Sequence, residues 1–278
     1  MVSMKMKVAV SNIAWDPSQL EEHLLILEQM GCKGVEISPS SIWAEPVLSN
    51  KKDRVNLLEI VKSYGLDIIS MHSLTYTHSE FKLFESEKSR VRLKQYLFKL
   101  IDLAHEIECP IMVFGSPQSR RIENNDYEKC YPIAVNFFHD IGEMAKSKGV
   151  IFCIEPLGPS DKCDFIMNAN EAYELIQQVN SENFSLHLDA KAMIDVREDY
   201  QEVFDNYGEI LKHFHVGDPG LRPPGTITDE HVKIGDALKR SKYDGYVSIE
   251  MKRGFGPSKE IVRDAIEYVK KVYMRNNE

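Results

Sequence analysis

The chain has 278 residues, of which 43% are hydrophobic and 28% are charged, and its formal net charge is −9. This length suits two average domains or one α/β barrel of roughly 250 residues, and the composition suits a folded core. The negative charge disfavours binding to nucleic-acid phosphates and, more weakly, to anionic membranes, so we expect neither partner.

The N-terminal segment and the cysteines indicate the cellular compartment. Residues 1–16 contain an apolar run that is too short for a signal peptide, and Asn12 and Asp16 interrupt it. No other stretch approaches the ~20 apolar residues of a membrane span. The five cysteines are odd in number and form no C-x-x-C pair, which is typical of reduced thiols. We therefore expect a cytoplasmic protein.

Short β-rich apolar runs alternate with longer helical patterns along the whole chain. Apolar residues recur at helical spacing from Leu20 to Met30, and Gly31 ends that pattern. Residues 169–179 and 259–273 show the same periodicity. The predicted strands are 7–12, 34–38, 67–73, 111–116, 150–156, 184–190, 210–218 and 245–251.

Eight strand–helix units without a linker between them favour one closed fold. We predict an α/β protein, a single (β/α)8 TIM barrel that occupies residues 1–278 as one domain. The alternative is a doubly wound open sheet. That fold would be expected to show a glycine-rich first turn, whereas the first strand here runs into the sequence SNIAWDPSQ.

The ends of the last four predicted strands carry metal-ligand side chains. In a TIM barrel the active site forms at the C-terminal ends of the strands, and these strands end in Glu155, Asp189, His215 and Glu250. Each residue alone would usually just be solvated, but together they favour a divalent-metal site. Three carboxylates and one imidazole suit Mn²⁺ first and Mg²⁺ or Co²⁺ next. Zn²⁺ is less suited, because structural zinc sites favour thiolates.

Two further histidines precede these ligands in the strands. His187 and His213 lie two positions before Asp189 and His215, so they should point into the barrel one layer below. We expect each to be a hydrogen-bonded interior histidine, or to support a ligand from below, rather than to bind metal itself.

The segments IEPLG, LHLDAKAM, HFHVGDPGLRPPG and HVKIGDALKRSKYDGYVSIEM resemble the xylose-isomerase-like TIM barrels. That family includes sugar and sugar-phosphate isomerases and epimerases, and also endonuclease IV. The likeness is strongest to the ketose 3-epimerase branch, whose single metal is bound by Glu, Asp, His and Glu from strands five to eight. The resemblance implies that Glu155, Asp189, His215 and Glu250 are the metal ligands here.

The chain departs from this branch at two places. The epimerases carry Asp-x-x-His on strand six, but Ala192 stands at the histidine position here, with Lys191 beside it. Their arginine after strand seven is matched by Leu221, and Arg222 follows one residue later. The resemblance therefore implies the chemistry but not the identity of the substrate.

The resemblance to endonuclease IV is partial. Asp229 and His231 look like its Asp-x-His metal motif. A trinuclear site would also need histidines at Ala192 and on strand four, where the sequence VFGS has none. With the negative net charge, this makes an endonuclease a low-ranked alternative.

A metal beside two glutamates suits proton abstraction next to a carbonyl through an enediolate. Glu155 and Glu250 are the candidate catalytic residues: one removes the proton as base, and the other returns one as acid. Return to the opposite face gives epimerisation, and return to the neighbouring carbon gives aldose–ketose isomerisation. We therefore predict a metal-dependent sugar or sugar-phosphate isomerase or epimerase.

Polar, aromatic and basic residues near the strand ends are candidate substrate contacts. Such side chains can grip sugar hydroxyls, cover a sugar ring or bind an anionic group on the substrate. Each also has a structural alternative, namely backbone hydrogen bonding, core packing or surface exposure. The candidates are Asn12, Trp15, Glu36, His72, Arg120, Lys191 and Arg222.

Two other functional classes stay open at this point. The basic residues after strands four, six and seven would also suit a metal-dependent lyase similar to 3-dehydroshikimate dehydratase. A non-enzymatic metal-binding subunit is the third class. The expected partner is a small carbohydrate or a related polyhydroxy acid, and the sequence leaves open whether copies of the chain form a homo-oligomer.

Overall fold

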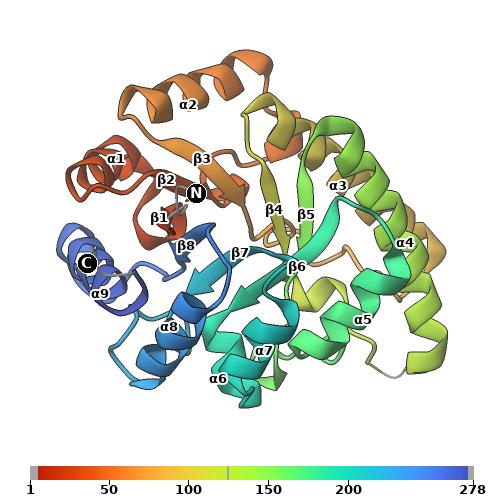
Figure 1. Cartoon of the computed structure of the whole chain (residues 1–278). Coiled ribbons are helices and arrows are strands. Elements are labelled where there is room, and N and C mark those ends of the chain that lie inside the picture. The colour runs from red at the N-terminus through yellow and green to blue at the C-terminus, as the bar shows by residue number, and fades with distance from the viewer. Residues whose placement is uncertain (1–5, 124, 275–278) are drawn as a thin grey trace.

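The computed structural model describes residues 6–123 and 125–274. Within these residues, eight parallel strands pair in chain order and β8 pairs back with β1, so the sheet closes into a barrel (Figure 1). This closure confirms the predicted TIM barrel and excludes the open sheet. The strands are β1 (Lys7–Ser11), β2 (Gly34–Ile37), β3 (Asp67–Met71), β4 (Ile111–Phe114), β5 (Ile151–Ile154), β6 (Phe184–Asp189), β7 (Leu211–Val216) and β8 (Tyr246–Ile249).

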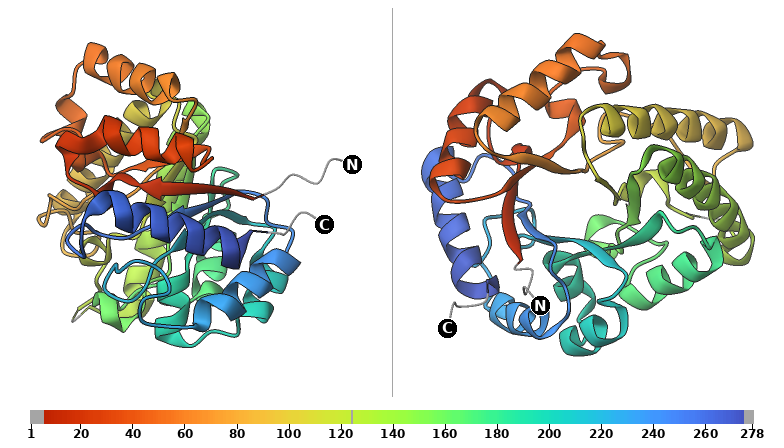
Figure 2. Two further views of the ribbon diagram at one scale, coloured as in Figure 1. Left: turned by 90° about the vertical axis from the view of Figure 1, so that its left-hand side faces the viewer. Right: turned by 45° about the horizontal axis from the view of Figure 1, so that its top comes forward.

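Helices lie outside the barrel and form a ring around it (Figure 1, Figure 2). The last helix packs against both α1 and α8, which closes this ring. No helix of the described segments is long and apolar enough to cross a membrane. The helices are α1 (Leu20–Gln29), α2 (Lys51–Ser63), α3 (Glu87–Glu106), α4 (Tyr127–Lys148), α5 (Ala169–Val179), α6 (Ala190–Val196), α7 (Tyr200–Tyr207), α8 (Glu230–Arg240) and α9 (Ser258–Tyr273).

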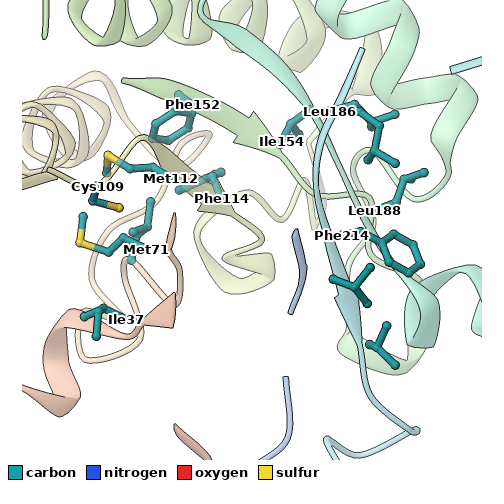
Figure 3. Close-up of a cluster of buried hydrophobic side chains, with 14 of the residues drawn as sticks. Ile37, Met71, Cys109, Met112, Phe114, Phe152, Ile154, Leu186, Leu188 and Phe214 are labelled. Carbon is teal, nitrogen blue, oxygen red and sulfur yellow. The ribbon is translucent and has the colours of Figure 1, made fainter. Parts of the chain in front are cut away.

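The two faces of the barrel sheet differ because successive residues of a strand point to opposite sides. The outward face packs against the helices through large apolar side chains such as Met112, Phe114 and Phe152 (Figure 3). Removing this layer from water supplies the main driving force for folding. The interior of a TIM barrel is usually filled by branched apolar side chains, but here several buried interior positions are polar. They include Ser11, Glu36, Ser70, His187, His213 and Ser248.

The observed strands lie inside the predicted ones and end one or two residues earlier. Glu155 and Glu250 therefore directly follow β5 and β8 instead of ending them, while Asp189 is the last residue of β6. The Asp189 carboxylate accepts a hydrogen bond from the backbone N–H of Lys191 and so caps the start of α6. The ends of the predicted domain, residues 1–5 and 275–278, lie outside the described residues.

Candidate active site

Four metal-ligand side chains meet at the C-terminal rim of β5 to β8. Glu155, Asp189, His215 and Glu250 each offer one ligand atom, and these atoms all lie within 4.8 Å of one another. The parallel strands bring their carboxyl ends to the same rim, and the strand register pairs Asp189 directly with His215. The structure thus brings together all four residues that the sequence placed at strand ends.

These four side chains fit a divalent cation. Asp189 Oδ2 and His215 Nδ1 are buried without a hydrogen-bond partner in the described part of the chain. Buried polar atoms are normally satisfied, and carboxylates at such short range repel one another. A cation between them would satisfy the free atoms and offset the negative charge. Because the set is rich in oxygen with one imidazole, it suits Mn²⁺ or a similar ion.

The two glutamates have different electrostatic environments. Burial raises the pKa of Glu155 to about 8, and the neighbouring carboxylates of Glu250 and Asp189 add to this effect. Burial would also raise the pKa of Glu250, but the His215 and His72 imidazoles outweigh it and hold that pKa well below its usual value. The pKa of Asp189 rises to about 6, mainly through burial. Two carboxyl groups with separated pKa values suit an acid–base pair.

A cavity of about 380 Å³ lies at this rim, and both Glu155 and Glu250 line it. The loops after β3 and β4 form much of its wall and are joined by hydroxyl contacts. Thr75 Oγ1 lies 3.0 Å from Ser116 Oγ and 2.9 Å from Ser119 Oγ. A concave site of this volume with a few convergent polar groups suits a small polar molecule.

Gly115 lies where the Glu155 carboxylate needs space. It directly follows β4, and a Cβ atom at this position would collide with Glu155 Oε2. Any other residue would therefore displace the glutamate from its present position. Ser116, the next residue, adopts a left-handed conformation with φ of 37° and begins the cavity wall.

Lys191 places an ammonium group in the wall of the cavity. Its Nζ lies 2.9 Å from Asp161 Oδ2 and 3.7 Å from Asp189 Oδ2. Burial lowers the pKa of Lys191, but the Asp189 and Asp161 carboxylates outweigh burial and raise it. Among the described residues, Lys191 is the only lysine or arginine that lines the cavity. Because Lys191 lies close to Asp161 and Asp189, its positive charge is already paired with carboxylates.

His72 lines the cavity next to Glu250 and contacts its carboxylate. Its Nδ1 lies 3.0 Å from Glu250 Oε1, and its Nε2 lies 2.6 Å from Ser11 Oγ. The ring is anchored on both sides and still lines the cavity. His72 therefore orients Glu250 and remains within reach of a bound molecule.

Two predicted substrate contacts in the loop after β1 are buried outside the cavity. The Asn12 side chain exchanges hydrogen bonds with the backbone of Ser38. Trp15 is 1% exposed and stacks on His23. Both side chains pack this loop against neighbouring residues, and neither lines the cavity.

The two arginines predicted to bind an anionic substrate group also lie outside the cavity wall. Arg120 is fully buried and donates hydrogen bonds to the backbone carbonyls of Gly115, Glu155 and two residues before α5. Arg222 is exposed, and its guanidinium lies 4.9 Å from the centroid of the Phe255 ring. Arg120 therefore has a structural role, because its donors are occupied by the backbone that positions Glu155.

Glu36, His187 and His213 are buried in the layer below the four candidate ligands. Glu36 does not reach the cavity; it is fully buried against His213 and His215. His213 is hydrogen-bonded, as expected. His187 is not: neither ring nitrogen has a hydrogen-bond partner in the described chain, and its Nε2 lies 3.8 Å from Glu155 Oε1. The His187 ring is fully buried inside the barrel, and its centroid lies 4.1 Å from that of the His215 ring.

The Asp-x-His motif similar to endonuclease IV does not form a metal cluster in the described chain. His231 Nε2 lies 2.8 Å from Asp218 Oδ1, and its Nδ1 lies 2.6 Å from the Tyr273 hydroxyl. This buried chain of contacts joins the loop after β7 to the end of α9. The geometry therefore removes the support for a trinuclear site.

Sequence reasoning missed much of the cavity wall. Thr75, Ser119 and Asp161 lie in loops between the predicted elements, where single polar residues carry little signal, and Ser116 is the last residue of the predicted fourth strand. A usable signal was present in the segment SLTYTHS after the third strand and in the serines of GSPQS after the fourth. Both runs place hydroxyl groups at the rim where a barrel forms its active site.

Comparison with known proteins agrees with this architecture. A D-psicose 3-epimerase from Ruminiclostridium cellulolyticum is 27% identical over 129 residues, which cover 46% of this chain and only 42% of that protein. The D-psicose 3-epimerase from Enterocloster bolteae is 22% identical over 254 residues, 88% of this chain and 82% of that protein.

Solved structures and a family model extend the comparison to nearly the whole chain. The crystal structure of a D-psicose 3-epimerase in the presence of D-fructose superposes with a TM-score of 0.79 at 18% identity. The match covers 96% of this chain and 99% of that one. The model of the family described as xylose isomerase-like TIM barrel matches residues 24–272. The chain therefore belongs to the xylose isomerase-like TIM barrel family.

Proposed function

We propose that this protein is a divalent-metal-dependent sugar isomerase or epimerase that uses Glu155 and Glu250 as acid and base. The observation that carries the proposal is that the carboxyl groups of Glu155 and Glu250 line one cavity beside Asp189 and His215. The opposite directions of their pKa shifts support it. The similarity to proteins named D-psicose 3-epimerase supports the same class of reaction.

Glu155, Asp189, His215 and Glu250 would hold the cation. We favour Mn²⁺, then Mg²⁺ or Co²⁺, over Zn²⁺, because hard carboxylate oxygens outnumber the single imidazole. When bound, such an ion polarises the substrate carbonyl and offsets the negative charge that develops on its oxygen.

The side chains of the protein carry out the proton transfer. One glutamate removes the proton from the carbon next to the carbonyl, and the other delivers a proton from its own carboxyl group. Delivery to the opposite face inverts that carbon, whereas delivery to the neighbouring carbon moves the carbonyl. His72 holds Glu250 in place, and Gly115 leaves the space that Glu155 occupies.

The cavity favours an uncharged sugar as substrate. Its wall carries the hydroxyls of Ser73, Thr75, Ser116 and Ser119, which suit hydrogen bonds to sugar hydroxyls. The ammonium group of Lys191 is paired with carboxylates, and neither predicted arginine lines the wall. A dehydratase acting on a carboxylated substrate is therefore not favoured, because the cavity lacks an unpaired cation among its described residues.

The decisive experiment follows solvent deuterium during turnover. The metal-loaded protein is incubated in D₂O with a panel of ketoses, aldoses, sugar phosphates and 3-dehydroshikimate, and products are analysed by mass spectrometry and NMR. We expect an isomerised sugar with one carbon-bound deuterium at the reacting carbon, while unreacted substrate stays almost unlabelled early in the reaction. An isomerised product without deuterium would refute the glutamate relay, and loss of one water would indicate a lyase.

A further inference from the structure

Glu36 is an ionisable side chain that lies inside the barrel and does not line the cavity. Glu36 lies in β2, is fully buried and has four hydrogen-bonding neighbours. Its Oε1 accepts from Ser70 Oγ at 2.7 Å and lies 3.1 Å from His213 Nε2. Its Oε2 accepts from Ser248 Oγ at 2.8 Å and lies 2.9 Å from His215 Nε2. Such a carboxylate is held in one orientation by partners from several strands.

His215 is the residue that joins Glu36 to the proposed metal ligands. A carboxylate only accepts hydrogen bonds, so the close approach of Glu36 places a ring hydrogen of His215 on Nε2. The opposite nitrogen, Nδ1, lies 3.5 Å from Glu250 Oε2 and has no hydrogen-bond partner in the described chain. Nδ1 of the ring therefore faces the carboxylates at the rim.

We propose that Glu36 is a positioning residue for the metal site: it holds His215 in the form that is protonated on Nε2 and directs Nδ1 to the cation. This inference rests on the proposed metal site. A carboxylate behind a ligating histidine fixes the orientation of the ring and makes it a better donor to a metal. With Ser70, Ser248 and His213 also on its oxygens, the Glu36 carboxylate is held in place behind His215.

The chain offers a matched control for this interaction. Asp218 is another fully buried carboxylate that meets a histidine, His231, at 2.8 Å, but His231 is outside the proposed ligand set. Glu36→Gln and Asp218→Asn make the same chemical change, from a carboxylate to an amide. Both should lower the thermal midpoint, because both replace one of two buried acceptor oxygens with an NH2 group that donates instead. Only the first should alter metal binding.

The test measures Co²⁺ affinity by competition with a chelator, together with the visible absorption of bound Co²⁺, which reports its ligands. For Glu36→Gln we expect affinity weaker by about 10- to 100-fold and an altered spectrum. Asp218→Asn should match the unmodified protein in both. Equal affinity and an unchanged spectrum in folded Glu36→Gln would overturn the inference while leaving the proposed function intact. An unmodified protein that binds no Co²⁺ would overturn both.

A measurement on the unmodified protein avoids dependence on a variant that fails to fold. The protein is labelled with nitrogen-15 in histidine and loaded with cadmium, and the metal–nitrogen coupling identifies the ligating atom by NMR. We expect the coupling on Nδ1 of His215 and the ring hydrogen on Nε2. Coupling on Nε2 would contradict the role of Glu36. Glu36→Asp, which keeps the charge on a shorter side chain, should bind metal more tightly than Glu36→Gln.

Discussion

The two halves of the barrel differ in what they present to the cavity. Strands β5 to β8 deliver Glu155, Asp189, His215 and Glu250, whereas the loops after β3 and β4 deliver mainly hydroxyl groups and a glycine. The charged groups of the second half sit close enough to repel one another unless a cation or a proton intervenes. The first half supplies shape and hydrogen bonding around them. In the proposed function, this difference assigns the reactive groups to one half of the sheet and the substrate contacts to the other.

The interior below the rim connects these halves. Glu36 belongs to β2, in the first half, but contacts His215 in the second, across the closed barrel. His72, at the end of β3, contacts Glu250 in the same way. The first half therefore also contacts two of the four candidate ligands, without supplying any of the four itself. Variants in each half should separate metal binding, proton transfer and substrate affinity.

The largest expected effect is the loss of proton transfer in Glu155→Gln. Glutamine can still offer an oxygen to the cation but cannot exchange a proton, so we expect kcat to fall by about 10³-fold or more. The measurement is kcat at saturating metal, with bound metal determined by elemental analysis. Near-normal turnover in a folded, metal-loaded variant would contradict the assigned role of Glu155.

The pH dependence of metal affinity should also report on Glu155. Because the pKa of Glu155 is raised to about 8, below that pH the carboxyl group holds a proton that an incoming cation must displace. The apparent metal affinity should therefore rise with pH, by up to about tenfold per pH unit for this proton, and level off above the pKa. Titration calorimetry from mildly acidic to alkaline pH measures it. Glu155→Gln should lose this part of the slope, and an equally steep slope in that variant would assign the proton elsewhere.

Metal should stabilise the fold because only the folded barrel gathers the four ligands. At a free metal concentration of about 100 times Kd, the expected gain is about 2.7 kcal/mol in the free energy of unfolding. Chelation should therefore lower the thermal midpoint measured by calorimetry. Asp189→Asn should show a smaller gain at the same metal concentration, because a neutral amide replaces one charged ligand. No shift with Mn²⁺, Mg²⁺ or Co²⁺ in the unmodified protein would argue against the site.

The smallest expected effect is a change in substrate affinity when a hydroxyl group is removed from the cavity wall formed by the loops after β3 and β4. Thr75→Val keeps the shape of the side chain but removes the hydroxyl that meets Ser116 and Ser119. Without the Thr75 hydroxyl, a neighbouring serine hydroxyl is no longer held toward the substrate. The loss of one hydrogen bond to the substrate is worth about 1 kcal/mol, so we expect KM to rise about three- to tenfold. Metal affinity, measured in parallel, should stay unchanged. A matching loss of metal affinity would show that the two halves are not separable.

Local patterns in the sequence were sufficient to predict the fold and to single out four side chains that the fold brings together. The alternation of short apolar runs with helical periodicity predicts eight strand–helix units, because both periods follow from backbone geometry within a few residues. The same registers predict which residues end the strands, and parallel strands in a barrel bring those ends to one rim. This is why Glu155, Asp189, His215 and Glu250 emerged from the sequence.

Only the tertiary structure decided which polar side chains meet the cavity. Asn12, Trp15, Glu36 and Arg120 carry suitable chemistry and lie near strand ends, yet packing buries all four elsewhere. Burial and partner choice depend on residues far apart in the chain, as the contact between Glu36 and His215 shows at a separation of 179 positions. The separated pKa values of the two glutamates have the same origin, because desolvation and nearby charges exist only once the barrel has closed.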